Sequence, residues 1–138
     1  MFEINGRKVG VYEKPYIIAE LSANHGGKIE SAKLAIKVAK DSGACAVKIQ
    51  TYTPDTMTID SDKPDFKIHH GLWKGYTLHN LYKEAYTPFE WHKELFDYAA
   101  EQGITLFSSP FDETAVDLLQ ELNAPAYKIA SFELIDLP

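Results

Sequence analysis

The sequence predicts an α/β protein with a parallel sheet, and more specifically the N-terminal part of a TIM (β/α)₈ barrel. Short apolar segments typical of buried strands alternate with amphipathic segments typical of helices, in the order β-α-β-α-α-β-α-β after a hairpin. A complete barrel needs about 250 residues, and the chain has 138. We therefore expect the hairpin and the first four barrel strands. The alternative is a small open sheet of four strands.

The first elements are a hairpin and a buried strand. Residues 2–11 flank Asn5-Gly6, a pair favoured in tight hairpin turns. Residues 16–21 (YIIAEL) form a nearly continuous apolar run, which is typical of a strand covered on both faces. The one charge in this run is Glu20, near its C-terminal end.

The next unit is a helix followed by a second strand. Apolar residues recur at helical spacing over 29–41, and Gly43 is placed to end the helix. The strand is predicted over 46–51 (AVKIQT), where alternation directs Lys48 and Gln50 to one face and the apolar residues to the other.

A long irregular segment separates the second strand from the third. Residues 52–75 contain two prolines, and a loop of this length in a compact domain is usually functional or mobile. A short helix is predicted over 77–85. A second helix extends to about residue 102, and its start at 87–90 (TPFE) matches a capping box with proline at the first helical position.

Two further strands complete the predicted order. The third covers 104–109 (ITLFSS), and Asp112 is a suitable N-cap for the helix that follows. That helix ends at Asn123, and the fourth strand is expected over 126–131 (AYKIAS).

Polar side chains gather near the C-terminal ends of the predicted strands, where parallel α/β folds bind ligands. They are Glu20, Lys48, Gln50, Ser109, Lys128, Ser131 and Glu133.

Two of these residues, Lys48 and Lys128, interrupt otherwise apolar strands. An ammonium group kept there needs a carboxylate neighbour or an anionic ligand. A structural ion pair between Glu20 and Lys48 satisfies the first possibility, and a phosphate or carboxylate held by both lysines satisfies the second. The sequence leaves both open, and it predicts that the lysines share one edge of the sheet.

The remaining polar residues point to no further centre. His25 is expected to order its glycine-rich loop, and His79 and His92 are expected at the surface. No cluster has the spacing of a metal site. The net charge of −6 argues against a nucleic-acid surface, and no apolar run reaches the length of a membrane span. With a single cysteine, Cys45, a reducing cytoplasmic setting is expected.

Four segments, in order, resemble successive motifs of the sialic acid synthase family. They are PYIIAELSANHGG, AVKIQTYTPDTM, LFSSPFD and PAYKIASFE, and together they span about residues 15–138. The segments 22–25, 71–88 and 130–133 resemble members that make pseudaminic acid more closely than those that make N-acetylneuraminic acid. A synthase of N-acetylneuraminic or legionaminic acid remains the alternative within the family.

The resemblance implies a role for each polar residue at the sheet edge. Glu20 and Glu133 match active-site carboxylates. A further set matches residues that bind phosphoenolpyruvate or lie beside it: Lys48, Gln50, Ser109, Lys128 and Ser131. The implied reaction condenses phosphoenolpyruvate with 2,4-diacetamido-2,4,6-trideoxy-L-altrose and releases phosphate.

The resemblance also implies parts that lie outside this sequence. A divalent metal, Mn²⁺ or Mg²⁺, would polarise the sugar aldehyde, and its ligands are expected beyond residue 138. The second half of the barrel and an antifreeze-like domain are likewise expected there, in a homodimeric enzyme. The isolated chain is therefore expected to be inactive.

Two alternatives of other classes remain. Lys48 in a strand could form an imine with a carbonyl substrate, as in a Schiff-base aldolase. The chain could instead be a half-barrel module that binds anions or another half without catalysis.

Overall fold

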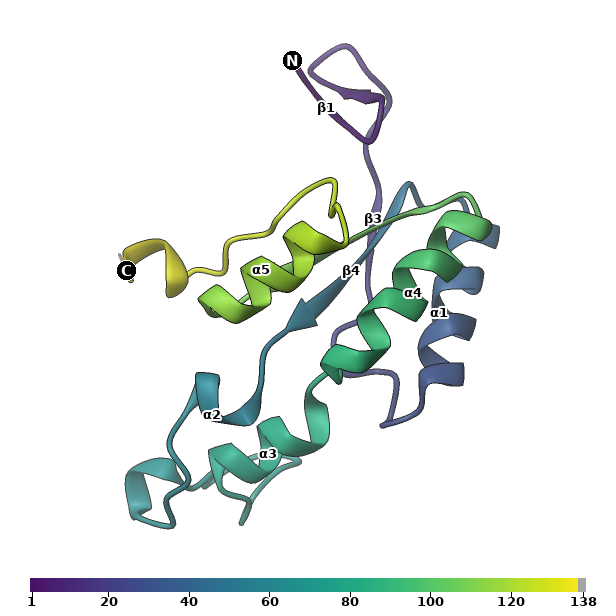
Figure 1. The fold of residues 1–138 in the computed structure, drawn as a ribbon. Coiled ribbons are helices and arrows are strands. Elements are labelled where there is room, and N and C mark those ends of the chain that lie inside the picture. Colours follow the sequence, from purple (N-terminus) through teal and green to yellow (C-terminus); the bar gives the residue numbers. More distant parts are fainter. Residues whose placement is uncertain (137–138) are drawn as a thin grey trace.

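A three-stranded parallel sheet forms the centre of the computed structural model, which describes residues 1–136 (Figure 1). Its strands are β3 (Ile18–Glu20), β4 (Ala46–Thr51) and β5 (Thr105–Pro110), in that spatial order. The three strands run in the same direction, so their C-terminal ends meet at one edge. Four of the polar residues predicted for that edge, Glu20, Lys48, Gln50 and Ser109, lie on these strands.

The described residues form five α-helices: α1 (Ile29–Asp41), α2 (Pro54–Met57), α3 (Leu78–Ala85), α4 (Phe89–Glu101) and α5 (Glu113–Glu121). Single 3₁₀ turns occur at Pro64–Phe66 and Glu133–Ile135. Helices α1 and α4 pack side by side against the sheet, and α2 and α3 form an insert beyond its C-terminal edge (Figure 1). Within residues 1–136, no helix combines the length and apolar character needed to cross a membrane.

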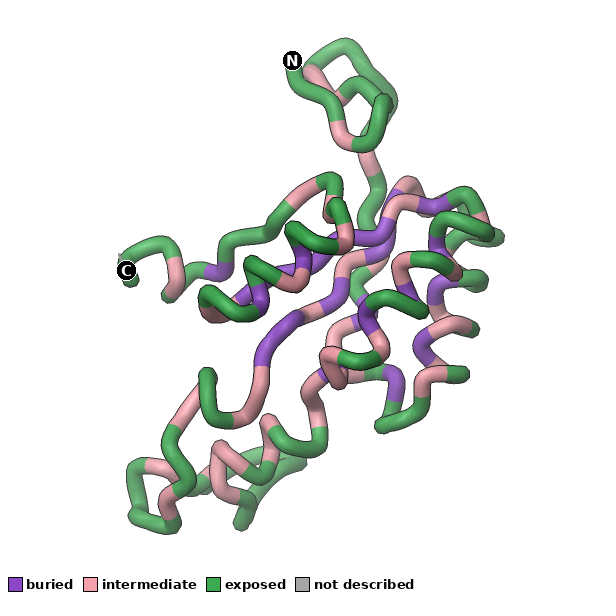
Figure 2. The backbone as a smooth tube through the Cα atoms, viewed as in Figure 1, coloured by how far each residue is buried: buried purple, intermediate pink, exposed green. Residues whose placement is uncertain are grey.

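The core lies between the sheet and the α1–α4 pair, where buried backbone is concentrated along the strands (Figure 2). Ala32 and Ile36 recur at helical spacing on α1 and are fully buried. From β4, Val47 and Ile49 enter this core, so Lys48 and Gln50 lie on the opposite face. The predicted helix over 29–41 and the predicted strand over 46–51 are both confirmed.

The N-terminal hairpin projects beyond the end of the sheet opposite the insert (Figure 1). Its strands, β1 (Phe2–Ile4) and β2 (Arg7–Val9), are joined by Asn5-Gly6 with φ of 48° and 76°. Positive φ at both positions is what the favoured hairpin turn requires, so the predicted turn is confirmed. The Asn5 side chain donates a hydrogen bond of 3.2 Å to Thr105 at the start of β5.

The predicted fourth strand is not formed as a strand. Residues 126–131 make one isolated bridge, between Ser108 and Tyr127, and the Lys128 N–H donates to the Ser108 carbonyl at 3.0 Å. The segment has a strand neighbour on one side only, and Ile129 is 55% exposed. With one strand neighbour and little side-chain packing, the segment makes this single bridge and no regular strand pairing.

Two predicted element boundaries are also wrong. The first strand begins at Ile18 and not at residue 16, because only its last three residues pair with β4. Helix α4 begins at Phe89, with Pro88 as N-cap, so the capping box predicted at 87–90 is absent. Thr87 is instead buried, and its hydroxyl has no hydrogen-bond partner among the described residues.

Candidate functional site

An ion pair joins β3 and β4 at the C-terminal edge of the sheet. The Lys48 ammonium lies 2.6 Å from a Glu20 carboxylate oxygen, and the two Cα atoms are register partners. The Lys48 side chain is 13% exposed and that of Glu20 is 44% exposed. An ion pair with Glu20 is one of the two ways, left open by the sequence, to satisfy the charge of Lys48, and this pair is formed. It lies on the sheet face opposite the core.

Two neutral side chains extend this cluster toward β5. Lys48 Nζ donates to the Ser109 hydroxyl at 3.4 Å, and Ser109 is the register partner of Gln50. Ser22 connects the cluster on the other side, since its N–H donates to Glu20 at 3.0 Å and its hydroxyl donates to Gln50 at 3.4 Å. Sequence reasoning missed Ser22, although a serine two residues after Glu20 is well placed to bond the carboxylate.

Lys128 lies with this cluster around one pocket. The pocket has a volume of about 580 Å³, and its charged lining residues are Glu3, Glu20, Lys48 and Lys128. Its apolar side comes from the hairpin residues Phe2 and Ile4 and from further side chains along the sheet. Two lysines and two glutamates line it, so its formal charges balance, and Glu20 already pairs with Lys48. The two ammonium groups are the groups in this pocket that can bind a small anion.

The last two predicted site residues follow Lys128 but do not line this pocket. Glu133 lies in the 3₁₀ turn and borders a neighbouring pocket of about 570 Å³ with Phe111 and Asp112. Burial raises the pKa of the Glu133 carboxyl, and the charge of Lys128 opposes that rise. One Glu133 oxygen is buried without a hydrogen-bond partner among the described residues. Ser131 is exposed.

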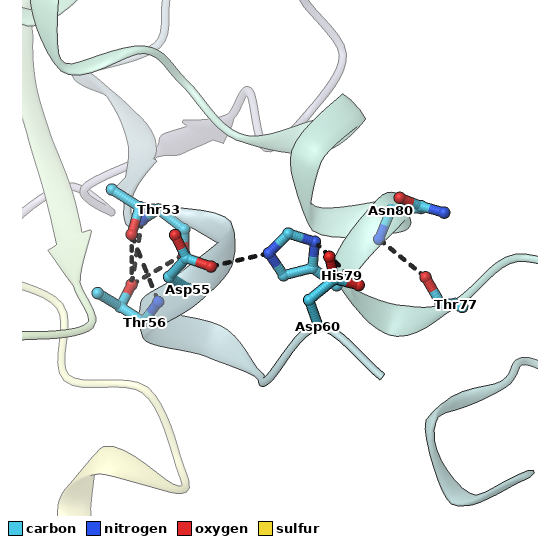
Figure 3. Close-up of polar contacts among 7 residues, drawn as sticks. All are labelled: Thr53, Asp55, Thr56, Asp60, Thr77, His79 and Asn80. Atoms are coloured by element: carbon cyan, nitrogen blue, oxygen red, sulfur yellow. Dashed lines mark hydrogen bonds and ion pairs between the residues drawn. The ribbon is translucent and has the colours of Figure 1, made fainter. Parts of the chain in front are cut away.

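The insert is tied together by His79, which was wrongly expected at the surface. Its side chain is 12% exposed, and its Nε2 lies 2.9 Å from Asp55 while its Nδ1 lies 3.9 Å from Asp60 (Figure 3). Thr53 caps α2 and Thr77 caps α3 in the same view. The imidazole therefore joins the two helices of the insert above the edge of the sheet.

His92 was also wrongly expected at the surface, because the helical pattern did not show that β4 and β5 cover it. It is fully buried, and its Nε2 lies 2.8 Å from the Thr51 hydroxyl. Burial lowers the pKa of the His92 ring. His25 agrees with expectation, since its Nδ1 accepts the Gly27 N–H at 3.1 Å and thereby orders the glycine-rich loop.

An aromatic contact fixes the start of the insert beside the site. Tyr52 follows β4 directly, and its ring meets the edges of Tyr82 and Phe111 at centroid distances of 5.7 and 5.5 Å. Burial, with a smaller contribution from Tyr82, raises the pKa of Tyr52 to about 12. The phenol therefore stays neutral, and its main contribution is packing.

The described part of the chain contains no group of three or more His, Cys, Asp or Glu side chains arranged to hold a metal ion. What the edge of the sheet offers is a pair of ammonium groups, hydroxyls and a carboxyl group with a raised pKa.

Comparisons with known proteins found similar sequences over most of this chain. The model of the NeuB family matches residues 35–138. The pseudaminic acid synthase of Campylobacter jejuni subsp. jejuni serotype O:2 is 54% identical over 124 residues, which is 90% of this chain and 36% of that protein. The pseudaminic acid synthase of Helicobacter pylori is 50% identical over 125 residues, 91% of this chain and 37% of that protein. The chain thus spans little more than a third of these curated relatives.

Two solved structures share the fold. The N-acetylneuraminic acid (sialic acid) synthetase of Leptospira borgpetersenii, crystallised with citrate, matches with a TM-score of 0.80 at 26% identity, over 98% of this chain and 42% of that one. The spore coat polysaccharide biosynthesis protein SpsE of Bacillus subtilis matches with a TM-score of 0.71 at 34% identity, over 96% of this chain and 34% of that one. These neighbours are consistent with a fragment of an α/β barrel.

Proposed function

The chain belongs to the NeuB family, and on this premise we propose that its protein condenses phosphoenolpyruvate with an open-chain acetamido sugar and releases phosphate. The favoured sugar is 2,4-diacetamido-2,4,6-trideoxy-L-altrose, which would make the product pseudaminic acid. The proposal carries over from relatives of which this chain covers little more than a third. The described residues would supply the phosphoenolpyruvate half of the site.

The observation that supports this proposal most strongly is the shared pocket of Lys48 and Lys128. Phosphoenolpyruvate carries a phosphate and a carboxylate on three carbons, so the two cations that line this pocket match its two anionic groups. Ser109 and Gln50 lie beside Lys48 with hydroxyl and amide groups for the remaining oxygens. Ser131 is exposed in the segment that follows Lys128, where it would reach the ligand once that segment is covered.

The proposed reaction requires two things of these residues: positive charge and a group that accepts a proton. The methylene carbon of phosphoenolpyruvate attacks the sugar aldehyde, which forms the new carbon–carbon bond. The cationic carbon that remains takes up water, and the resulting tetrahedral phosphate adduct then breaks its carbon–oxygen bond to release phosphate. Lys48 and Lys128 would neutralise negative charge through these steps.

Glu133 is the candidate for accepting the proton of the attacking water. A carboxyl group whose burial raises its pKa is a better base toward water than an ordinary one. Glu20 would act differently, because its carboxylate holds Lys48 at 2.6 Å and so fixes the ammonium beside the ligand. We expect Glu20 to assist by orientation and charge.

A divalent metal, Mn²⁺ or Mg²⁺, belongs to the proposal only for the whole protein. The described residues offer no group of three or more metal-ligating side chains, so they do not fit such an ion. The homodimer and the cytoplasmic setting are likewise proposed only for the whole protein. Metal analysis and light scattering of the full-length protein would test the first two.

The Schiff-base alternative is disfavoured by the pairing of Lys48. An imine needs a lysine lone pair, and an ammonium held 2.6 Å from a carboxylate does not offer one. Borohydride treatment with pyruvate or a sugar aldehyde tests this directly. A covalent adduct on Lys48 would support the aldolase and contradict the synthase. A half-barrel module without catalysis would bind the anion and release no phosphate with any sugar.

The activity test measures phosphate released from phosphoenolpyruvate by the full-length protein that carries this sequence. Three sugars are compared: the altrose derivative, its mannose-configured isomer, and N-acetylmannosamine. We expect release with all components present and the highest kcat/KM with the altrose derivative. Preference for another sugar would revise the product, and no release with any of them would contradict the proposed reaction.

A further inference from the structure

A buried chain of polar side chains connects helix α4 to the end of β5. His92 Nε2 lies 2.8 Å from the Thr51 hydroxyl, which in turn lies 2.6 Å from the Ser108 hydroxyl. The other ring nitrogen of His92, Nδ1, lies 3.0 Å from the Pro88 carbonyl, and Ser108 also approaches the Ile49 carbonyl at 3.1 Å. Thr51, His92 and Ser108 are all fully buried. These groups depend on one another because water does not reach them.

The direction of each hydrogen bond follows from the chemistry of the end group. A carbonyl oxygen only accepts, so Nδ1 of His92 must carry a hydrogen and donate it to Pro88. Burial lowers the pKa of the ring, which leaves it neutral with an unprotonated Nε2. Thr51 therefore donates to His92, and the single hydroxyl hydrogen of Ser108 is shared between the Ile49 carbonyl and the Thr51 oxygen. Both hydroxyl groups, of Thr51 and of Ser108, then have a hydrogen-bond acceptor.

The far end of this chain lies next to the candidate site. Ser108 precedes Ser109, whose hydroxyl accepts from Lys48 at 3.4 Å. The Ser108 carbonyl accepts the Lys128 N–H at 3.0 Å, and Tyr127 forms the isolated bridge to the same residue. Ser108 is thus the point where the polar chain, the Lys48 cluster and the segment with Lys128 meet.

We propose that His92 is a positioning residue for phosphoenolpyruvate: through Thr51 and Ser108 it holds the end of β5 so that Ser109 and Lys128 remain aligned with Lys48. The inference rests on the proposed function for the identity of the ligand. The competing role is local, because the bond from His92 to Pro88 also secures the first turn of α4.

Two substitutions separate these roles. In His92→Asn the amide group can replace Nδ1 and keep the bond to Pro88, and it is too short to reach Thr51. In His92→Gln the longer side chain can place an oxygen where Nε2 was and accept from Thr51. A positioning role predicts that His92→Gln keeps the wild-type affinity for phosphoenolpyruvate and that His92→Asn loses it. A local role at the start of α4 predicts the reverse.

The experiment measures amide hydrogen exchange and phosphoenolpyruvate affinity for wild type and both variants of the full-length protein. Loss of a buried hydrogen bond corresponds to roughly a tenfold change, so we expect exchange at Lys128 and the Kd for phosphoenolpyruvate each to rise about tenfold in His92→Asn. His92→Gln should stay within about threefold of wild type by the same conversion, and the KM for the sugar should not change in either variant.

Three outcomes would overturn the positioning role: wild-type exchange and affinity in His92→Asn, equal losses in both variants, or increased exchange confined to α4. Thr51→Val provides a second variant if His92→Asn does not fold, because it removes the same link without altering the helix. If wild type itself fails to bind phosphoenolpyruvate, the proposed function is contradicted. The exchange at Lys128 then still decides whether His92 acts through Ser108.

Discussion

The Glu20 carboxylate and the Lys48 ammonium lie 2.6 Å apart on neighbouring parallel strands whose Cα atoms are in register. The two partners differ in solvent access, because the lysine is 13% exposed and the glutamate 44%. Because of this asymmetry, loss of Glu20 and loss of Lys48 should lower the free energy of unfolding by different amounts. An unpaired lysine would be poorly solvated, whereas an unpaired glutamate would still reach water.

Stability measurements should reveal that asymmetry. We expect Glu20→Gln to lower the free energy of unfolding by about 1–2 kcal/mol more than Lys48→Met does, since it leaves a partly buried charge without its partner. Urea unfolding of both variants is the measurement. Lys37→Met, which breaks an exposed pair with Asp41, is the control and should cost less than about 1 kcal/mol. Equal losses in the two site variants would show that burial does not distinguish the partners.

Lys128 is expected to affect ligand affinity without affecting stability. Its side chain is exposed in an irregular segment, so Lys128→Met should leave the melting temperature unchanged. The lost hydrogen bond to a charged ligand should weaken phosphoenolpyruvate binding by about 10- to 100-fold. Calorimetric titration measures this, with the exposed Lys93 on α4 replaced by Met as the matched control. Wild-type affinity in Lys128→Met would remove this residue from the site.

The buried histidines should make stability depend on pH. Burial lowers the pKa of both His25 and His92 below the ordinary histidine value of 6.5, so the unfolded chain binds more protons than the folded one just below that pH. Stability is therefore full above pH 6.5 and falls as the pH decreases toward the folded pKa values, by at most about 1.4 kcal/mol per pH unit for each histidine.

Urea unfolding between pH 7.5 and 5.5, values chosen to bracket roughly the ordinary histidine pKa, tests this dependence. His92→Gln should flatten the slope, and replacement of the exposed His70 by Gln should leave it unchanged. A slope that is identical in wild type and His92→Gln would show that His92 does not titrate as its burial requires.

The contact of His79 with Asp55 should govern the order of the insert. His79→Ala removes the link between α3 and α2, so hydrogen exchange should increase across 53–60 while the core helix α1 stays protected. We expect an effect equivalent to about 1 kcal/mol, because Asp55 is largely exposed. His69→Ala, in the same insert, is the control. Unchanged exchange at 53–60 would mean that aromatic packing alone orders the insert.

The sequence was most informative where structure is set locally. The helix over 29–41, the turn at Asn5-Gly6 and the placement of Lys48 and Gln50 on the face opposite Val47 and Ile49 follow from spacing and turn chemistry, and all are confirmed. The membership of the family is likewise confirmed by the comparisons. The roles of the seven site residues remain predictions.

What the sequence could not show depends on packing between distant segments. His92 lies on an amphipathic helix, and nothing in its own helix reveals that Thr51 and Ser108 bury it. The fourth strand has a strand-like sequence at 126–131, but regular pairing needs partners that the described residues supply on one side only. Thr87 matches a cap in sequence, yet α4 starts one residue later than that motif requires.

The claim that a single ligand is held by both Lys48 and Lys128 is tested most directly by competitive acetylation of lysines at increasing phosphoenolpyruvate concentration, read by mass spectrometry on the full-length protein. Both lysines should lose reactivity at the same half-saturating concentration, each by about tenfold or more for a bond to a charged ligand, while Lys93 reacts as before. Protection of one lysine without the other, or protection at two different concentrations, would contradict a shared ligand.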